Sequence, residues 1–256
     1  MDHRPPRLLI PDGAQGEVGN DRLLGGPGGD TLGLGAGDDL LRGGGGRDSI
    51  GWQKKGVDFL ADLTRGIARG AGQDTLTGIE HVAAYGTEDL ALVGIPGHNI
   101  LIGIVQSSGN TAVFHGGGGD DLLMGDQDGA VSSRFFGGSG NDRVVVTCGS
   151  EAVQAQLYGG DGSDRIKALS CGPSSLAGGR GSDRLEGGPN LDGGPGNDDL
   201  LGDEGANRLL GAAGNDQLVG GPGDDVLDGG PGVNSNHGGA GTDTCVNPSG
   251  GQDCEG

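Results

Sequence analysis

Aromatic residues are scarce in this chain: one Trp, two Tyr and four Phe among 256 residues. That scarcity excludes a globule built around large aromatic side chains. The sequence has no run of about 20 apolar residues, so it predicts no membrane span. Basic residues are also few, with 16 Lys and Arg against 36 Asp and Glu, which gives a net charge of −20. A nucleic-acid-binding protein needs a basic face, and this charge balance argues against nucleic acid as a partner.

Glycine is the residue in excess, with 63 copies, about one residue in four. Because each Gly costs a helix interior about 1 kcal/mol, a helical bundle is excluded. Gly does not recur every third residue and Pro is limited to 11 copies, which excludes a collagen triple helix. The acidic residues are 29 Asp and only 7 Glu, a bias typical of turns and metal-binding loops. Composition alone would also suit a disordered chain.

A nine-residue repeat argues against disorder. Four contiguous units occupy 16–51, six more occupy 193–246, and four separated units begin at Gly116, Gly137, Gly159 and Gly178. The fourth position is Gly in all 14 units, the sixth is Asp in 12, and the eighth is Leu, Ile or Val in 12. A disordered low-complexity tract has no reason to keep three columns in phase, so the pattern predicts a folded repeat.

Each unit is interpreted as a six-residue turn followed by a three-residue strand. Glycines at positions one, two and four allow positive φ and close backbone approach, so several carbonyls can point inward. The Asp at position six adds a carboxylate, and mixed carbonyl and carboxylate oxygens are the ligands that Ca²⁺ selects. The predicted sixth-position metal ligands are Asp21, Asp30, Asp39, Asp48, Asp121, Asp142, Asp164, Asp183, Asp198, Asn207, Asp216, Asp225 and Asp243. The fourth-position glycines included in the predicted site are Gly19, Gly28, Gly37, Gly46, Gly119, Gly140, Gly162, Gly181, Gly196, Gly205, Gly214, Gly223 and Gly241.

The strand residues predict the core. The middle residue of each strand is apolar and points to one face, while its neighbours point to the other. Two units then close one coil of 18 residues, with strands on two faces, turns on two edges and a thin ladder of Leu, Ile and Val inside. Asn236 replaces the apolar residue in the unit 229–237, which suggests a fading end of the stack.

This pattern resembles the RTX (repeats-in-toxin), or hemolysin-type, calcium-binding nonapeptide family. The resemblance implies an all-β fold, a parallel β-roll (β-solenoid) of stacked coils with almost no helix and several calcium ions in the turns. The segment 58–103 is similar to a spacer common in such arrays, with degenerate units around Asp74 and Asn99. In this family, calcium-dependent folding is taken to favour secretion of an unfolded chain.

The spacing also predicts how the chain is organised. The expected parts are an N-terminal extension (1–15), N-terminal repeats (16–51), a spacer (52–115), central repeats with one motif per coil (116–192), contiguous C-terminal repeats (193–246) and a tail (247–256). The central units begin 21, 22 and 19 residues apart, or one coil plus a small insertion. The residues GGPNLD (187–192) form a shortened half-coil.

The same spacing assigns turns to edges. Along one edge we expect Asp121, Asp142, Asp164, Asp183, Asp198 and Asp216; along the opposite edge we expect Asn207, Asp225 and Asp243. The half-coils 125–136 and 146–158 lack the motif, so we expect no metal on their edge.

Catalytic motifs do not emerge. None of the five His forms HExxH, there is no GxSxG, and the GGGG runs at 43–46 and 116–119 are not followed by GK[ST]. Trp52, with Lys54 and Lys55, is interpreted as spacer and not as a binding site. The four Cys allow three pairings, of which we expect the local ones, Cys148–Cys171 and Cys245–Cys254; free thiols are the alternative.

The sequence therefore predicts an extracellular calcium-binding β-roll, monomeric and without catalytic activity, whose folding depends on calcium. No cleavable signal peptide is visible, and the location rests on the calcium requirement and the even Cys count. One alternative is the repeat module of a larger secreted enzyme or toxin, such as a protease, lipase or epimerase. Another is a Gly-rich structural surface protein indifferent to calcium.

Overall fold

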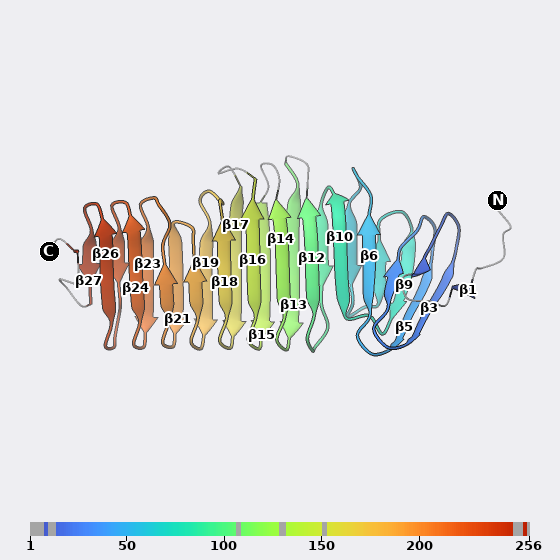
Figure 1. The fold of residues 1–256 in the computed structure, drawn as a ribbon, viewed down its shortest axis with the longest axis horizontal. Coiled ribbons are helices and arrows are strands. Elements are labelled where there is room, and N and C mark those ends of the chain that lie inside the picture. Colours follow the sequence, from blue (N-terminus) through green and yellow to red (C-terminus); the bar gives the residue numbers. More distant parts are fainter. Residues whose placement is uncertain are drawn as a thin grey trace.

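Two facing sheets of parallel strands form a long solenoid (Figure 1). The computed structural model describes residues 8–9, 14–105, 109–127, 132–149, 153–247 and 253–254. Within them the chain forms 27 strands and no helix. The chain passes from one sheet to the other at almost every turn, so the coils stack from the N-terminal end to the C-terminal end, and the all-β solenoid predicted from the repeats is confirmed.

The 15-stranded sheet is called the first sheet and the 12-stranded sheet the second. In spatial order the first sheet contains β1 (Leu8–Leu9), β3 (Arg22–Pro27), β5 (Leu40–Gly45), β9 (Gln73–Thr77), β8 (Ile67–Arg69), β7 (Phe59–Asp62), β11 (Leu90–Val93), β13 (Thr111–Gly118), β15 (Ser132–Ser139), β17 (Gln154–Asp161), β19 (Ser175–Arg180), β21 (Asn190–Pro195), β23 (Arg208–Ala213), β25 (Val226–Asp228) and β27 (Thr244–Val246). The second contains β2 (Ala14–Gln15), β4 (Thr31–Gly33), β6 (Ser49–Gln53), β10 (His81–Thr87), β12 (Ile100–Val105), β14 (Leu122–Gln127), β16 (Arg143–Cys148), β18 (Arg165–Leu169), β20 (Arg184–Glu186), β22 (Asp199–Leu201), β24 (Gln217–Pro222) and β26 (Ser235–Ala240).

The strand register gives the length of each coil. Leu23 on β3 is opposite Leu41 on β5, and Leu200 on β22 is opposite Leu218 on β24, which is 18 residues in both cases. Through the centre of the second sheet the turns that precede the strands repeat after 21, 22 and 19 residues, as the spacing predicts. The next step takes only 15 residues, because 187–192 forms a shortened half-coil.

The core is a thin ladder to which most of the facing strands contribute one or two apolar side chains. The eighth residue of a unit, the middle of its strand, points inward and is fully buried from Leu23 in the first unit to Leu227 near the C-terminal end. In the longer half-coils of the first sheet the same place is taken by Phe114 and Phe135, whose ring centroids lie 4.5 Å apart. Asn236 is buried at the end of the ladder, where its amide donates to the Val246 carbonyl.

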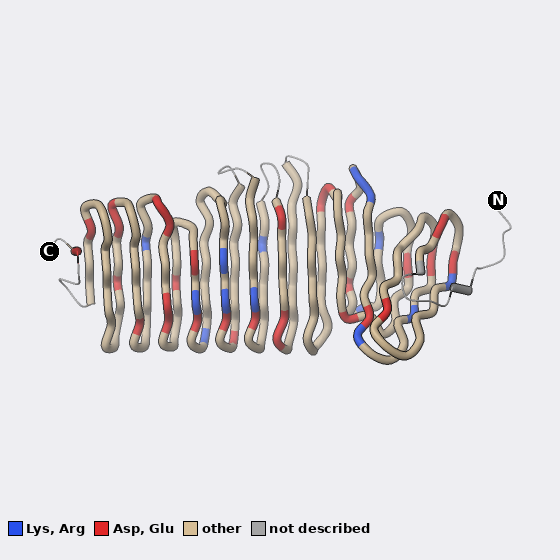
Figure 2. Tube along the Cα trace, viewed as in Figure 1, with Lys and Arg blue, Asp and Glu red and all other residues tan. Residues whose placement is uncertain are grey.

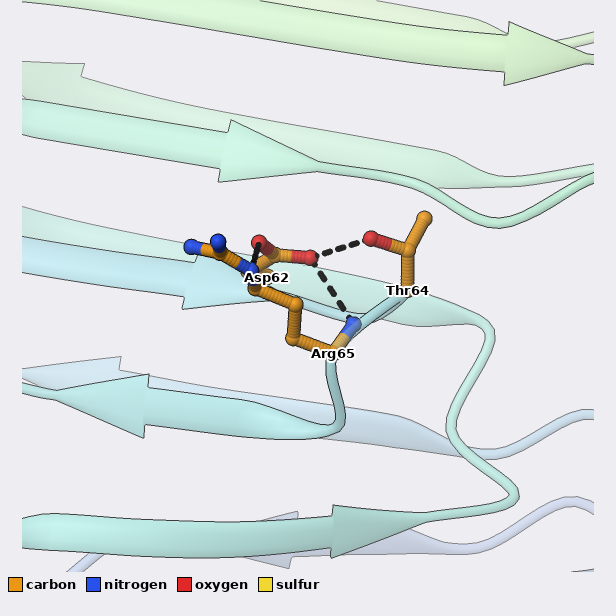
Figure 3. A network of polar contacts seen from close by, with 3 residues as sticks. All are labelled: Asp62, Thr64 and Arg65. Carbon is orange, nitrogen blue, oxygen red and sulfur yellow. Dashed lines mark hydrogen bonds and ion pairs between the residues drawn. The ribbon is translucent and has the colours of Figure 1, made fainter.

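The spacer departs from the simple coil. Strand β8 pairs antiparallel with both β7 and β9. In the first sheet β9, β8 and β7 lie between β5 and β11, whereas in the second sheet β10 alone lies between β6 and β12. Asp62 turns the chain at the end of β7 by accepting hydrogen bonds from the Thr64 hydroxyl, at 2.6 Å, and from the Arg65 N–H (Figure 3). Trp52 is buried in this region, where its ring stacks on Phe59, which fits the interpretation that it belongs to the spacer core.

Both disulfides are local. Cys148 at the end of β16 pairs with Cys171, and Cys245 on β27 pairs with Cys254. The predicted pairing is confirmed, and no Cys in the described residues is free. The first bond joins the end of β16 to the segment between β18 and β19, and the second joins Cys254 to the last strand, β27.

Candidate metal centre

Sixth-position carboxylates are stacked from coil to coil along two edges of the solenoid. In the second column, which leads into the second sheet, the backbone N–H of Asp121 donates to Asp142 Oδ1, Asp142 N–H donates to Asp164 Oδ1, and Asp164 N–H donates to Asp183 Oδ1. The donor–acceptor distances are 2.7–2.8 Å. The ladder then continues through Asp198 and Asp216. Figure 2 shows acidic residues recurring at the ends of successive strands.

The first column leads into the first sheet and is interrupted by the spacer. At the N-terminal end Asp21 N–H donates to Asp39 Oδ1 and Asp39 N–H donates to Asp74 Oδ1. At the C-terminal end Asn207 N–H donates to Asp225 Oδ1, and Asp225 N–H donates to Asp243 Oδ1. The predicted distribution of these turns over two edges is therefore what the structure has, and the degenerate unit around Asp74 is in register.

In most of the interior carboxylates one oxygen, Oδ1, accepts a backbone N–H from the neighbouring coil, and the other, Oδ2, accepts no hydrogen bond. In the described part of the chain, Oδ2 is buried without a hydrogen-bond partner in ten Asp residues. Each of these residues is at most 6% exposed. They are Asp30, Asp48, Asp121, Asp142, Asp164, Asp183, Asp198, Asp216, Asp225 and Asp243. A buried carboxylate oxygen without a donor costs free energy, so this arrangement requires a cation or a proton.

A backbone carbonyl of the following coil lies beside the unpaired oxygen in these turns. A Cβ added to Gly137 would lie 2.4 Å from Asp142 Oδ2 and 2.7 Å from the carbonyl oxygen of Gly159, the first residue of the next unit in the same column. A Cβ on Gly159 would lie 2.2 Å from Asp164 Oδ2 and 2.5 Å from the Gly178 carbonyl oxygen. The first-position glycine thus keeps open a small space between a carboxylate oxygen and a carbonyl oxygen of the following coil.

The fourth-position glycines, which recur in every repeat unit, shape the turn. The fourth-position residue has positive φ in 12 of the 13 predicted site glycines, from 98° at Gly119 to 157° at Gly196; Gly205 is the exception. At Gly140 a Cβ would lie 2.3 Å from the Gly119 carbonyl oxygen of the preceding coil. Any other residue would therefore be strained there and would also push adjacent turns apart.

These donors fit a hard divalent cation. Within the described residues, no three His, Cys, Asp or Glu side chains come together as a metal-binding cluster. The donor set is instead one carboxylate per turn with a backbone carbonyl of the following coil, an oxygen-only set of the kind that Ca²⁺ accepts in irregular geometry. The unpaired Oδ2 atoms face this space, so the residues present suit calcium better than a soft metal.

Sequence reasoning missed Glu80. Its Oε2 accepts a hydrogen bond from Asp48 N–H at 2.8 Å, so this side chain takes the place of an Asp in the second column. Glu80 lies two residues before buried Val82, the same offset as Asp48 before Ile50, and that offset was the available clue. The repeat pattern does not mark it because Glu replaces Asp at the sixth position and Gly78 is the one turn glycine that this unit retains.

Burial raises the pKa of the stacked carboxyl groups. The pKa rises to about 7 at Asp164 and Asp198, and to about 6 at Asp142 and Asp74. Loss of hydration is the main cause, and the neighbouring carboxylates of the column add to it, while the backbone hydrogen bond to Oδ1 opposes it. The pKa is also raised by burial at Asp39, Asp121, Asp183, Asp216 and Asp225.

More than half of the chain matches the family model of the RTX calcium-binding nonapeptide repeat (4 copies), over residues 15–50, 113–129, 156–170, 172–189, 192–227 and 210–245. The chain belongs to this repeat family. The comparison with curated proteins gave no match. Among solved structures, the extracellular lipase of Serratia marcescens is 21% identical, with a TM-score of 0.21, over 80% of this chain and 34% of the lipase. The chain thus matches about a third of the lipase's length. The described residues contain no helix able to cross a membrane.

In metal-stripped protein, we expect the folded state to lose stability as the pH rises from about 4 to about 7. Asp164 keeps a proton in the folded chain up to about pH 7, whereas the unfolded chain releases it near the ordinary value of 3.8. Folding therefore binds protons within this window, and acid partly replaces the cation. Circular dichroism between pH 4.5 and 7.5 measures the effect. Asp164→Asn should flatten the pH dependence, and a stability that rises with pH would contradict the expectation.

Proposed function

We propose that the turns of this RTX chain bind Ca²⁺ and that the binding free energy drives folding of the solenoid. The observation that supports this most directly is the set of ten buried Asp Oδ2 atoms without a hydrogen-bond donor. In each turn the Asp carboxylate and the carbonyls of its own and the following coil would hold the ion. Membership in a calcium-binding repeat family supports the same metal.

The chain's own residues prepare these sites. First-position glycines such as Gly137 leave the space open, and the N–H of the preceding coil fixes each Asp by its Oδ1. The Oδ2 atoms then lie in a column of like charges, which repel one another when ionised. A divalent cation between adjacent turns supplies the compensating charge, and because the column exists only in the folded chain, binding and folding are linked.

We also propose that the protein acts outside the cell and has no catalytic activity of its own. Extracellular modules typically bind Ca²⁺ with dissociation constants of about 10⁻⁴–10⁻³ M, so the turns would fill outside and remain empty in the cytosol. The two disulfides suit an oxidising compartment. The alternative, a calcium-binding module of a larger secreted enzyme or toxin, has the same support from the repeat family.

Isothermal titration with CaCl₂ is expected to show several ions bound per chain. MgCl₂ should bind weakly, because Mg²⁺ dehydrates reluctantly and demands near-octahedral geometry that backbone carbonyls of two coils do not provide. Asp126, which is exposed on β14 outside the turns, offers the control: Asp126→Ala should bind the wild-type number of ions. Equal affinities for the two metals, or no heat with either, would rule out the proposal.

A further inference from the structure

The side-chain amide of Asn99 occupies the position that a cation would take in the other turns. Its Nδ2 donates to the carbonyl oxygens of Ile95, at 2.8 Å, and Gly97, at 2.5 Å, and to Asp121 Oδ1 at 2.9 Å. It also lies 3.5 Å from the carbonyl oxygen of Gly116, the first residue of the next coil's turn. One amide nitrogen thus contacts oxygens of its own turn and of the next coil.

The corresponding oxygens of an Asp turn have no such donor. In the Asp142 turn the carbonyl from the following coil belongs to Gly159, and it faces the unpaired Asp142 Oδ2. Replacing that Oδ2 by an NH₂ group changes an acceptor into a donor with two hydrogens. The turn then satisfies its carbonyl oxygens by itself, and the position loses both the negative charge and the room that a cation needs.

Two other turns have Asn at the sixth position, and they are closed in different ways. Asn234 Nδ2 donates to the carbonyl oxygen of Gly230, the second residue of its turn, at 2.8 Å, while its Oδ1 accepts Asp216 N–H in the column. In the Asn207 turn Oδ1 faces the space beside the Gly220 carbonyl of the next coil. This turn is closed because that oxygen accepts Asp203 N–H at 2.8 Å, while Nδ2 donates to Asp203 Oδ1 at 2.9 Å.

The backbone at the second position separates the same two kinds of turn in every case except the Asn234 turn, where Gly230 has a φ of 75° and the amide alone closes the turn. In four turns the second residue does not have positive φ, and its N–H donates to the sixth side chain: Glu17 to Asp21, Gly35 to Asp39, Ile95 to Asn99 and Asp203 to Asn207. In all ten turns with an unpaired Oδ2 the second residue has positive φ, from 69° at Ala212 to 133° at Gly26. Positive φ turns the N–H away, which leaves the Oδ2 without a donor.

We propose that these closed turns do not bind calcium and that they divide the array into three separate runs of sites. The runs are Asp30 and Asp48; Asp121, Asp142, Asp164, Asp183, Asp198 and Asp216; and Asp225 and Asp243. Asn99 and Asn234 lie at the two ends of the long run, and Asn207 lies where the last run begins. This inference rests on the proposed function and refines the sixth-position set predicted from sequence, because Asp21, Asp39 and Asn207 belong to closed turns.

The closed-turn hypothesis can be tested in the middle of the long run. In Asp164→Asn the new Oδ1 can still accept Asp142 N–H, and the new amide can donate to the Gly160 carbonyl, as Asn234 does with Gly230. Asp164→Ala removes the same charge without supplying a donor. Both variants should bind fewer calcium ions than wild type. In metal-free buffer only Asp164→Asn should fold at a clearly lower concentration of trimethylamine N-oxide, an osmolyte that favours burial.

The reverse change should open a turn. Ile95→Gly with Asn99→Asp provides a second-position residue able to adopt positive φ and an Asp at position six, and titration should count one more calcium ion than in wild type. An unchanged ion count in this double variant, or the same osmolyte midpoint for Asp164→Asn and Asp164→Ala, would overturn the inference. If the proposed function is wrong, wild type will bind no calcium. The osmolyte comparison is made without metal, so it still decides whether the amide closes the turn.

Discussion

Removal of calcium is expected to convert the chain from β-structure to a largely disordered state. The fold brings ten carboxylates with unpaired oxygens into columns, in a chain with a net charge of −20. Its core offers little to oppose their repulsion, because most strands contribute only one or two inward apolar side chains, such as Leu200 on β22 or Val144 and Val146 on β16. The conformational entropy of 63 glycines also opposes folding.

Far-ultraviolet circular dichroism with a few millimolar CaCl₂ or with EDTA measures this transition. We expect a β spectrum with calcium and a disordered spectrum with EDTA at pH 7.5, reversible when calcium is restored. MgCl₂ at the same concentration serves as the control for ionic strength and should restore little structure. A β spectrum that persists in EDTA would show that the apolar ladder and the two disulfides hold the solenoid without metal.

The architecture was predictable because three properties of the sequence repeat in phase. Glycine at position four, Asp at position six and an apolar residue at position eight each have a separate physical role, and the structure uses them in that way at Gly140, Asp142 and Val144. The shortened half-coil at 187–192 could also be predicted, because the number of residues between two motifs fixes the length of the coil that joins them.

The spacer was predictable only in part. Its degenerate units around Asp74 and Asn99 do join the columns, but the antiparallel strand β8 was not expected. The turn that produces it depends on Asp62, and no repeat marks that residue. A strand's partner in such a segment is decided by contacts between residues distant in sequence, which local patterns do not report.

The sequence showed which residue types form the candidate site, but not which turns have an unpaired carboxylate oxygen and which are closed. The repeat register placed Asn207 among the predicted ligands together with the Asp residues. In the structure Asn207 Oδ1 is not free, because it accepts Asp203 N–H, and the Asn207 amide bonds Asp203 Oδ1. The second-position backbone was equally hidden: Gly35 and Gly26 are both glycine, yet only Gly26 has positive φ.

Loss of an interior Asp is expected to cost more calcium and more stability than loss of an exposed Asp. Asp142 accepts Asp121 N–H and lies between the turns of Asp121 and Asp164, so Asp142→Ala should weaken the sites on both sides. It also leaves Asp121 N–H buried without its acceptor and leaves the neighbouring carboxylates uncompensated. We expect about 1–3 kcal/mol for each affected site.

Asp126→Ala is the matched control, because it removes the same charge from an exposed position on β14, where the Gly-x-Asp turn is missing. Asp128, which sequence reasoning paired with it, lies outside the described residues. Calcium titration and unfolding of wild type and the two variants should place Asp142→Ala well below wild type, with Asp126→Ala close to it. Equal losses of bound calcium in the two variants would mean that bulk negative charge attracts the ions. A loss confined to Asp142→Ala would mean that binding depends on the geometry of the turn, because there the preceding coil fixes one carboxylate oxygen and the other is free to bind the metal.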